Sequence, residues 1–206
     1  MIALVDYGAG NLASVRKALR ACGASVFEPA GPADVGRASA IVLPGVGHFA
    51  ATASLGEGWR SAIRGCLEAG VPFLGICLGM QWLFDGSEEA PDVPGLGWLP
   101  GRIARLPDRA ADGGRVKVPH AGWNVARVVG LPEGGNAVPG LRDGAYYYFT
   151  HAYAAAVTDD AAAVTAYGIT FASAVRRGNV CGVQFHPEKS GDEGLAVLRG
   201  FAGGGR

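Results

Sequence analysis

The sequence has no excess of charge of either sign and little charge altogether. Lysine plus arginine and aspartate plus glutamate number 18 each among 206 residues, and together they make up 17% of the chain. Proteins that bind nucleic acid normally carry a basic excess, so nucleic acid is not expected as a main partner. With 49% hydrophobic residues, the chain is expected to form a compact globular protein instead of a disordered one.

Long apolar runs are also missing. No stretch approaches the roughly 18 consecutive apolar residues that a membrane helix needs. The apolar run at the start of the chain, residues 2–5, is short and has no basic segment before it, unlike a secretory signal peptide. We therefore expect a protein of the cytoplasm with no membrane partner.

Cysteine and histidine are scarce, with four of each, and neither is arranged as a metal site. There is no C-x-x-C pair and no H-E-x-x-H motif. Reduced thiols are the expected state of the cysteines in a cytosolic protein. Neither a metal ion nor another cofactor is predicted. The cysteines are Cys22, Cys66, Cys77 and Cys181.

The first half of the chain alternates between strand-like and helix-like patterns. Strands are predicted over residues 2–7, 25–28, 40–43 and 73–76, with helices over 12–22 and 59–67 between them. This rhythm is typical of a parallel sheet with helices on its faces. After Phe84 the runs become short and strand-rich, with a helix at the end. They cover residues 96–99, 116–119, 123–125, 145–153, 162–167, 171–179 and 180–185, and the helix covers 190–201.

The predicted fold class is therefore α/β, an open and mostly parallel twisted sheet flanked by helices, with antiparallel strand extensions. Residues 1–206 are expected to form a single domain. In such sheets the ligand site lies beyond the carboxyl ends of the strands. Residues 6–8, 44–47 and 75–77 follow three of these ends and should meet at one edge. The glycines of residues 8–10 do not complete a phosphate-binding motif, so no nucleotide site is predicted there.

One cysteine follows the strand at 73–76 directly, in the stretch Gly-Ile-Cys-Leu-Gly. A strand that turns at once into a helix must bend sharply at Cys77, and Gly75 and Gly79 leave room for that bend. This is the nucleophile-elbow arrangement with cysteine in place of serine. The start of a helix favours the thiolate form of such a cysteine. The alternative is a buried structural cysteine, since free cysteine is often buried.

A second chemical feature follows the strand at 180–185. His186 is followed by Pro187, which restricts it to extended geometry, and by Glu188, which can reach one imidazole nitrogen. A carboxylate on histidine fixes its tautomer and stabilises the imidazolium, and a histidine paired with cysteine can take and return its proton. The alternative is an ordinary surface histidine and glutamate after a strand.

A nucleophilic cysteine also needs donors for the oxyanion that develops on its substrate. The N–H of Leu78 is one candidate, by analogy with other nucleophile elbows. Residues 44–47, Pro-Gly-Val-Gly, can offer a second N–H with little steric cover. The alternative for residues 44–47 is an ordinary turn from strand to helix.

Taken together, these motifs resemble the class I glutamine amidotransferases, which have a flavodoxin-like α/β fold. The resemblance is carried by residues 6–12, 44–47, 75–81, 117–124, 148–153 and 184–190. Within that family, the D-Y-G-x-G-N start, the P-H-x-G-W-N stretch and the H-P-E-K-S ending resemble the glutaminase subunits of histidine biosynthesis. Those subunits deliver ammonia to a separate cyclase subunit of (β/α)8-barrel fold. That cyclase makes imidazole glycerol phosphate and an aminoimidazole carboxamide ribonucleotide.

The resemblance implies a role for each matching position. Cys77 would be the nucleophile, His186 the general base and acid, and Glu188 the residue that orients it. The oxyanion hole would be formed by Gly45, Val46, Gly47 and Leu78. The amino-acid end of glutamine would be held by Gln81, His151, Ala152 and Tyr153. The positions that would face the partner or the ammonia passage are Asn11, Trp123, Tyr148 and Lys189.

Two positions depart from the family pattern. Ala121 stands where a larger apolar residue is expected, and Ala152 where serine or threonine is common. If glutamine is bound through the backbone there, Ala152 costs little; otherwise glutamine affinity is reduced. Of the remaining histidines, His48 is predicted to start a helix at the surface and His120 to have a structural or interfacial role.

Three other functions remain open from the sequence. The chain could be the glutaminase subunit of another synthase, such as pyridoxal phosphate synthase. It could be a stand-alone cysteine hydrolase of the same fold, or a regulatory subunit whose triad is idle. We also expect the oxyanion strand of the isolated subunit not to be correctly oriented, because a glycine-rich peptide flips easily and uncoupled hydrolysis would waste glutamine.

Overall fold

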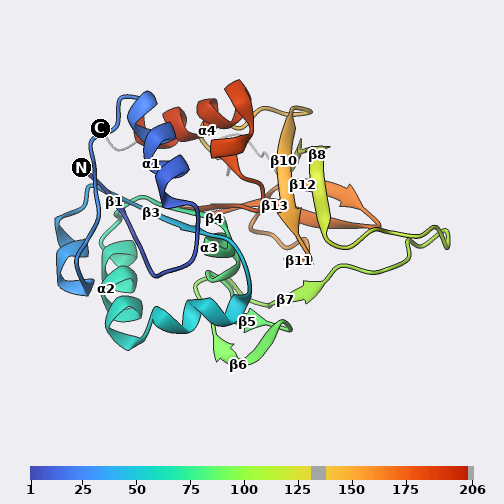
Figure 1. Ribbon diagram of the computed structural model, residues 1–206, viewed down its shortest axis with the longest axis horizontal. Helices are drawn as coiled ribbons and strands as arrows, with labels where there is room; N and C mark the ends of the chain where they lie inside the picture. Colours follow the sequence, from blue (N-terminus) through green and yellow to red (C-terminus); the bar gives the residue numbers. More distant parts are fainter. Residues whose placement is uncertain (131–137, 204–206) are drawn as a thin grey trace.

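The computed structural model describes residues 1–130 and 138–203. Within this part of the chain the central element is an eight-stranded sheet (Figure 1). Its strand order is β2 (Val26–Phe27), β1 (Ile2–Leu4), β3 (Ala40–Gly45), β4 (Phe73–Cys77), β14 (Val180–Val183), β13 (Ile169–Arg177), β12 (Ala161–Tyr167) and β9 (Arg127–Val128). The first five strands pair in parallel and the last three are added antiparallel. This arrangement confirms the predicted α/β sheet with antiparallel extensions.

Helices cover both faces of the parallel part of the sheet. Helices α1 (Leu12–Ala21) and α4 (Gly191–Gly203) lie on one face, and α2 (Glu57–Glu68) lies on the other (Figure 1). The short helices η1 (Pro32–Arg37) and η2 (Phe49–Ser54) lie close to α2 and β6, respectively. Strand side chains alternate between the two faces. Ile41 and Leu43 of β3 therefore pack into the core on the α2 side, whereas Val42 packs into the core with α1 and α4.

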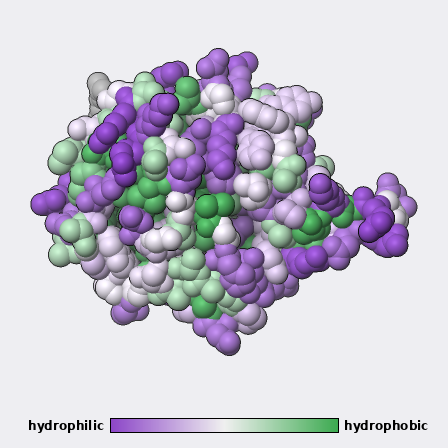
Figure 2. Space-filling view, in the orientation of Figure 1, coloured by the Kyte–Doolittle hydropathy of each residue, from purple (hydrophilic) through white to green (hydrophobic). Residues whose placement is uncertain are grey.

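Two smaller sheets extend the central one. Strands β8 (His120–Val125) and β10 (Tyr146–His151) pair antiparallel. The other sheet has the order β11 (Tyr153–Ala154), β7 (Arg102–Arg105), β5 (Gly86–Ser87) and β6 (Ala90–Pro94). The loop from β7 to β8 projects from the body of the molecule in Figure 1, and Figure 2 shows its tip covered by hydrophilic side chains.

The prediction of a strand over residues 96–99 was wrong. The segment follows β6, and its backbone N–H groups donate to carbonyl oxygens of the turn after α3 (Leu78–Gln81). Leu96 N donates to Trp82 O over 2.6 Å, and Leu99 N donates to Leu83 O over 3.0 Å. Since these donors are used locally, they do not pair with a neighbouring strand. The short strands β5, β6 and β7 around this segment were not predicted.

The prediction of a strand over residues 116–119 was also wrong. Val116 N donates to Asp108 O within the same long loop, and the Lys117 carbonyl accepts from the Tyr167 hydroxyl over 2.7 Å. The Val116 N–H and the Lys117 carbonyl are therefore not available for hydrogen bonds with a neighbouring strand. The strand begins only at His120. The helix that follows Cys77 directly, α3, is short and ends at Gln81.

The predicted meeting of three strand ends at one edge is confirmed. Gly45 pairs in register with Cys77 across β3 and β4. A Cβ built on Gly10 would lie 3.3 Å from the Gly45 Cα, so the loop after β1 reaches the same place. Among the described residues, no helix is long and apolar enough to cross a membrane.

The packing around Gly79 leads to a stability prediction. A Cβ on Gly79 would overlap the carbonyl oxygen of Leu43 in the neighbouring strand. Gly79→Ala should therefore lower the free energy of unfolding by about 1–3 kcal/mol, the usual cost of overpacking. Urea denaturation would measure this change.

Gly65→Ala provides the matched control. Gly65 lies within α2, and a Cβ there would meet nothing within 4 Å. This change should raise stability by about 0.5–1 kcal/mol, because alanine favours a helix over glycine. Equal effects of the two substitutions would contradict the tight packing inferred at Gly79.

Candidate active site

Cys77 has a strained backbone at the end of β4. Among the residues that the structure describes, it is the only non-glycine residue with a positive φ (φ 53°, ψ −106°). It directly precedes α3 and is 4% exposed. Such strain persists where the surrounding structure enforces it, and it is common at functional sites. The predicted elbow is therefore confirmed, although α3 is only four residues long and its dipole is correspondingly small.

Glycines make the elbow possible, as predicted. A Cβ on Gly75 would lie 2.7 Å from the backbone nitrogen of Met80, on the far side of the turn. A Cβ on Gly45 would overlap the Tyr7 hydroxyl and lie 2.8 Å from the Leu78 Cβ. The chain at Gly45, at Gly75 and at the start of α3 thus comes closer together than residues larger than glycine would permit at these positions.

His186 and Glu188 form a buried pair beside this elbow. Strand β14, three residues before His186, pairs in parallel with β4, so Val183 lies opposite Ile76. His186 Nδ1 and Glu188 Oε1 are 2.8 Å apart, and their side chains are 4% and 2% exposed. The backbone of His186 is fixed on both sides, since its N–H donates to Tyr148 O and its carbonyl accepts from the Ser190 hydroxyl.

The charges at this site favour protonated His186. Burial of the ring opposes the positive charge, but interactions with Cys77 and Glu188 outweigh it and raise the pKa of His186 to about 10. Nε2 of His186 and Oε2 of Glu188 are both buried without a well-directed hydrogen bond to a described residue. The nitrogen not held by Glu188 is thus left available for proton transfer.

Of the four residues predicted for the oxyanion hole, Gly45 and Leu78 lie at the elbow, and Val46 and Gly47 follow Gly45 in the chain. Gly45 ends β3 beside Cys77, and Leu78, the first residue of α3, is 1% exposed. Val46 is 38% exposed and Gly47 has a φ of 108°, a conformation that side chains rarely adopt. After Gly45 the chain therefore leaves the sheet, and it does so with a positive φ at Gly47 that other residues rarely adopt.

Tyr7 belongs to the strand end at residues 6–8 that was predicted to reach this edge, but the sequence analysis gave its side chain no role. Its hydroxyl lies against Gly45, is buried and has no hydrogen-bond partner among the described residues. Burial, followed by the negative charge of Cys77, raises the pKa of Tyr7. The signal that could have found it is its position at the end of the first strand, where the ligand edge of the sheet is expected.

The residues predicted to bind glutamine are joined by hydrogen bonds within the protein. Gln81 Nε2 donates to the Tyr153 carbonyl over 2.9 Å and to Gln184 Oε1 over 3.0 Å. His151 Nδ1 lies 2.9 Å from the same Tyr153 carbonyl, and the Ala152 carbonyl accepts from Leu106 N. Their contact with glutamine remains a prediction.

Gln184 contacts the sulfur and was not among the predicted site residues. Its Nε2 lies 3.5 Å from Cys77 Sγ, and its side chain is completely buried. It begins the stretch Gln-Phe-His-Pro-Glu that pointed to the histidine, so the motif contained the signal.

Three of the residues predicted to face a partner form one surface cluster. The rings of Trp123 and Tyr148, on the paired strands β8 and β10, are 6.0 Å apart and nearly perpendicular. Lys189 Nζ lies 5.9 Å from the centre of the Tyr148 ring. Asn11 lies elsewhere along the chain, where its side chain caps α1 by accepting from Ser14 N. Trp123 is 56% exposed.

The other histidines behave as the sequence predicted. His48 is exposed and precedes η2, where its Nδ1 accepts from Ala50 N over 3.1 Å. His120 is buried among aromatic rings in a structural setting. Across residues 1–130 and 138–203, no three histidine, cysteine, aspartate or glutamate side chains are grouped to hold a metal ion.

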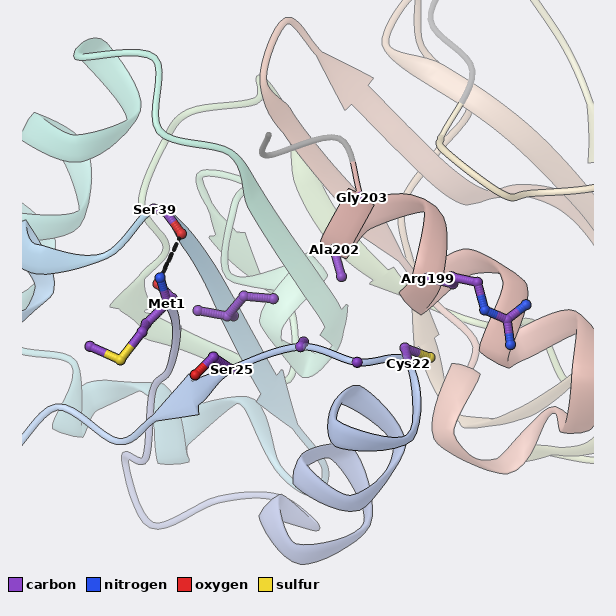
Figure 3. Close-up of a pocket in the computed structure, with 10 residues that line it drawn as sticks. Met1, Cys22, Ser25, Ser39, Arg199, Ala202 and Gly203 are labelled. Carbon is purple, nitrogen blue, oxygen red and sulfur yellow. Dashed lines mark hydrogen bonds between the residues drawn. The ribbon is translucent and has the colours of Figure 1, made fainter.

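A separate cavity of about 380 Å³ lies at the amino ends of the strands, opposite the triad. Its lining includes Met1, Ser25 and Ser39, with Cys22 and Arg199 from the ends of two helices (Figure 3). The Met1 ammonium donates to the Ser39 hydroxyl over 2.9 Å. The cavity therefore shares no residue with the elbow.

A strained cysteine beside a buried His–Glu pair, at the carboxyl edge of an α/β sheet, defines the class of cysteine-dependent acyl-transfer enzymes. The family model described as glutamine amidotransferase class-I matches residues 3–202. The chain belongs to the class I glutamine amidotransferase family.

Individual relatives are similar over nearly the whole chain. A Moorella thermoacetica protein named imidazole glycerol phosphate synthase subunit HisH is 46% identical, over 97% of this chain and 93% of its own length. The subunit of the same name from Methanothermobacter thermautotrophicus is 44% identical, over 98% and 97%. The chloroplastic imidazole glycerol phosphate synthase hisHF of Arabidopsis thaliana is 42% identical over 98% of this chain, which corresponds to 34% of that longer protein.

Solved structures share the fold. A crystal structure described as glutamine amidotransferase superposes with a TM-score of 0.72 at 22% identity, covering 98% of this chain and 100% of that one. The glutaminase domain of Trypanosoma brucei CTPS superposes with a TM-score of 0.64 at 17% identity, covering 98% and 93%. At these identities the likeness concerns the fold alone.

The His–Glu contact leads to a prediction for Glu188→Gln. The amide keeps an acceptor for Nδ1 but removes the negative charge that helps to raise the pKa of His186. The pKa of His186 should therefore fall, and the rate constant kcat for glutamine hydrolysis should drop by about 10²- to 10⁴-fold. NMR titration of the ring and a glutamate-release assay would measure the two effects.

Glu193→Gln is the matched control, because the Glu193 carboxylate forms an ion pair with Arg142 instead of with His186. It should leave both quantities unchanged. A normal kcat in Glu188→Gln would exclude the orienting role of Glu188.

Proposed function

We propose that residues 1–206 act as one glutaminase domain that hydrolyses glutamine to glutamate and ammonia. The observation that carries the proposal is the buried His186–Glu188 contact of 2.8 Å, which follows β14, the strand paired with that of the strained Cys77. An imidazolium beside a thiolate, held by a carboxylate, is the arrangement that acyl transfer to cysteine needs.

The reaction proceeds in two halves. The Cys77 thiolate attacks the side-chain carbonyl carbon of glutamine, and the developing oxyanion is bound by backbone N–H groups around Leu78 and residues 45–47. Protonated His186 gives its proton to the departing nitrogen, which leaves as ammonia and a glutamyl thioester remains. His186 then takes a proton from water, which attacks the thioester and releases glutamate.

Gln81, His151, Ala152 and Tyr153 are proposed to hold the amino-acid end of the substrate. Gln81 and His151 are joined through the Tyr153 carbonyl. Since the Tyr153 carbonyl already accepts from both Gln81 and His151, this network is ordered before substrate binds. Preordered contacts reduce the entropic cost of binding.

The ammonia is proposed to pass to a partner cyclase of (β/α)8-barrel fold, as in a synthase that makes imidazole glycerol phosphate and the aminoimidazole carboxamide ribonucleotide for histidine biosynthesis. The proposal is supported by relatives that are named as subunits of imidazole glycerol phosphate synthase. The surface cluster of Trp123, Tyr148 and Lys189, with Asn11, is the proposed docking face. The exposed ring of Trp123 suits such a role, because aromatic residues are enriched in interfaces.

We further propose that the partner activates the site, within the cytoplasm. Cys77 and His186 are almost completely buried in the isolated chain. The segment after Gly45 turns at Gly47 with a positive φ, and a peptide in such a segment can rotate at little steric cost. The four cysteines are all free thiols, which suits a reducing compartment.

Glutamate release tests the proposal. The purified chain alone should release little glutamate from glutamine, and adding the cyclase with its nucleotide ligand should raise the rate strongly. Cys77→Ala should abolish the reaction in both mixtures, because the substitution removes the sulfur on which the thioester is proposed to form.

Other outcomes distinguish the alternatives. Equal rates with and without the cyclase would contradict partner activation and indicate a stand-alone glutaminase. No glutamate release in any mixture would exclude the proposed activity.

A further inference from the structure

The amide of Gln184 is placed directly against the nucleophilic sulfur. Its Nε2 lies 3.5 Å from Cys77 Sγ, and its Oε1 lies 3.0 Å from Gln81 Nε2. The two ends of a glutamine amide have nearly the same shape, so the end that faces the sulfur must be determined from the surrounding hydrogen bonds.

The Tyr153 carbonyl determines that orientation. A carbonyl oxygen can only accept, so the end of Gln81 that lies 2.9 Å from it must be the NH₂ group. The same NH₂ group faces Gln184, which must therefore present its oxygen there. A reversed Gln184 would oppose two NH₂ groups. The NH₂ group of Gln184 is thus directed at the sulfur.

The same carbonyl determines the state of two histidines. His151 Nδ1 lies 2.9 Å from Tyr153 O and must donate to it. In neutral His151 the other nitrogen, Nε2, then accepts, and its neighbour at 3.1 Å, His120 Nδ1, is the donor. His120 Nε2 consequently accepts from Asn124 Nδ2 over 3.2 Å. The second N–H of the Asn124 amide donates to Ala166 O, so the two N–H groups serve His120 and Ala166 separately.

Both histidines are held neutral by their surroundings. Burial lowers the pKa of His120 to about 4 and that of His151 to about 3. The His120 ring lies between Tyr167 and Phe149, with ring centres 3.9 and 4.8 Å away. Positive charge on His186 also disfavours a charge on His151. Each ring therefore has one tautomer, with its proton on Nδ1.

We propose that Gln184 is a further catalytic residue, whose amide N–H stabilises the anionic sulfur of Cys77 and holds it in place. The Tyr153 carbonyl sets the orientation of that amide through the positioning residue Gln81. The same carbonyl also accepts from the last member of a second run of donors, Asn124 to His120 to His151, here called the Asn124 chain. The Asn124 chain starts next to Trp123, on β8, and ends at the Tyr153 carbonyl. The catalytic role of Gln184 rests on the proposed glutaminase reaction, whereas the assigned directions of the hydrogen bonds do not depend on it.

The decisive variant is Gln184→Met, which keeps the length of the side chain but cannot donate. Hydrogen bonds to charged groups are worth enough to change a rate by about tenfold to hundredfold. The rate of Cys77 alkylation by iodoacetamide should fall by that factor, as read from the Cys77 peptide by mass spectrometry. With the cyclase and its ligand present, kcat for glutamine hydrolysis should fall similarly, while KM changes less than twofold.

Thr165→Val is the matched control. Thr165 is buried and its hydroxyl donates to Val125 O over 2.9 Å, so this variant also loses a buried hydrogen bond, outside the Asn124 chain. It should leave the alkylation rate and kcat unchanged. An unchanged alkylation rate in folded Gln184→Met, or equal losses in both variants, would overturn the proposal.

The hydrogen-bond directions can be tested in the unmodified chain, even if Gln184→Met does not fold. Nitrogen-15 NMR of the imidazole rings should find the proton on Nδ1 in both His120 and His151. A proton on Nε2 of either ring would overturn the Asn124 chain. Slower alkylation of Gln184→Met in a chain that never hydrolyses glutamine would support the sulfur contact and exclude the proposed function.

Discussion

The left-handed backbone at Cys77 is the constraint on which the site depends. A non-glycine residue in a sparsely populated region costs about 1–3 kcal/mol, so the neighbouring structure must impose it. Here β3 pairs with one side of β4 and β14 with the other, and Gly45, Gly75 and Gly79 allow the turn to sit against both. The strain lifts the sulfur from the plane of the strand toward its chemical partners.

The order of the parallel strands determines on which side of Cys77 each of the other site residues lies. Strand β3 delivers Gly45 and the following peptides from one flank, and β14 leads to Gln184, His186 and Glu188 on the other. A sheet fixes these positions to within small distances, because every strand is bound along its length. The proposed oxyanion donors thus lie on the β3 side of the sulfur, whereas the group for proton transfer and the Gln184 amide lie on the β14 side.

The sequence could predict the parts of this site that follow directly from local patterns. The glycines around Cys77 leave room for a sharp bend, and the proline between His186 and Glu188 restricts the backbone of His186, so the elbow and the His–Glu pair could be predicted. The network behind them could not be predicted, since Asn124 and His120 come from β8, His151 from β10 and Gln81 from α3, and the contacts between these elements depend on register. The wrong strands at 96–99 and 116–119 have a similar cause, because nearby carbonyls and side chains use their hydrogen-bonding groups. Local apolar character does not reveal such competition.

The central claim is that Cys77 alone carries the acyl group, and trapping that intermediate tests it most directly. The chain, with the cyclase and its ligand, would be mixed with glutamine, quenched in acid during turnover and digested for mass spectrometry. A glutamyl thioester should appear on the Cys77 peptide and be absent from those of Cys22, Cys66 and Cys181. An adduct on another cysteine, or active turnover in Cys77→Ala, would contradict the account.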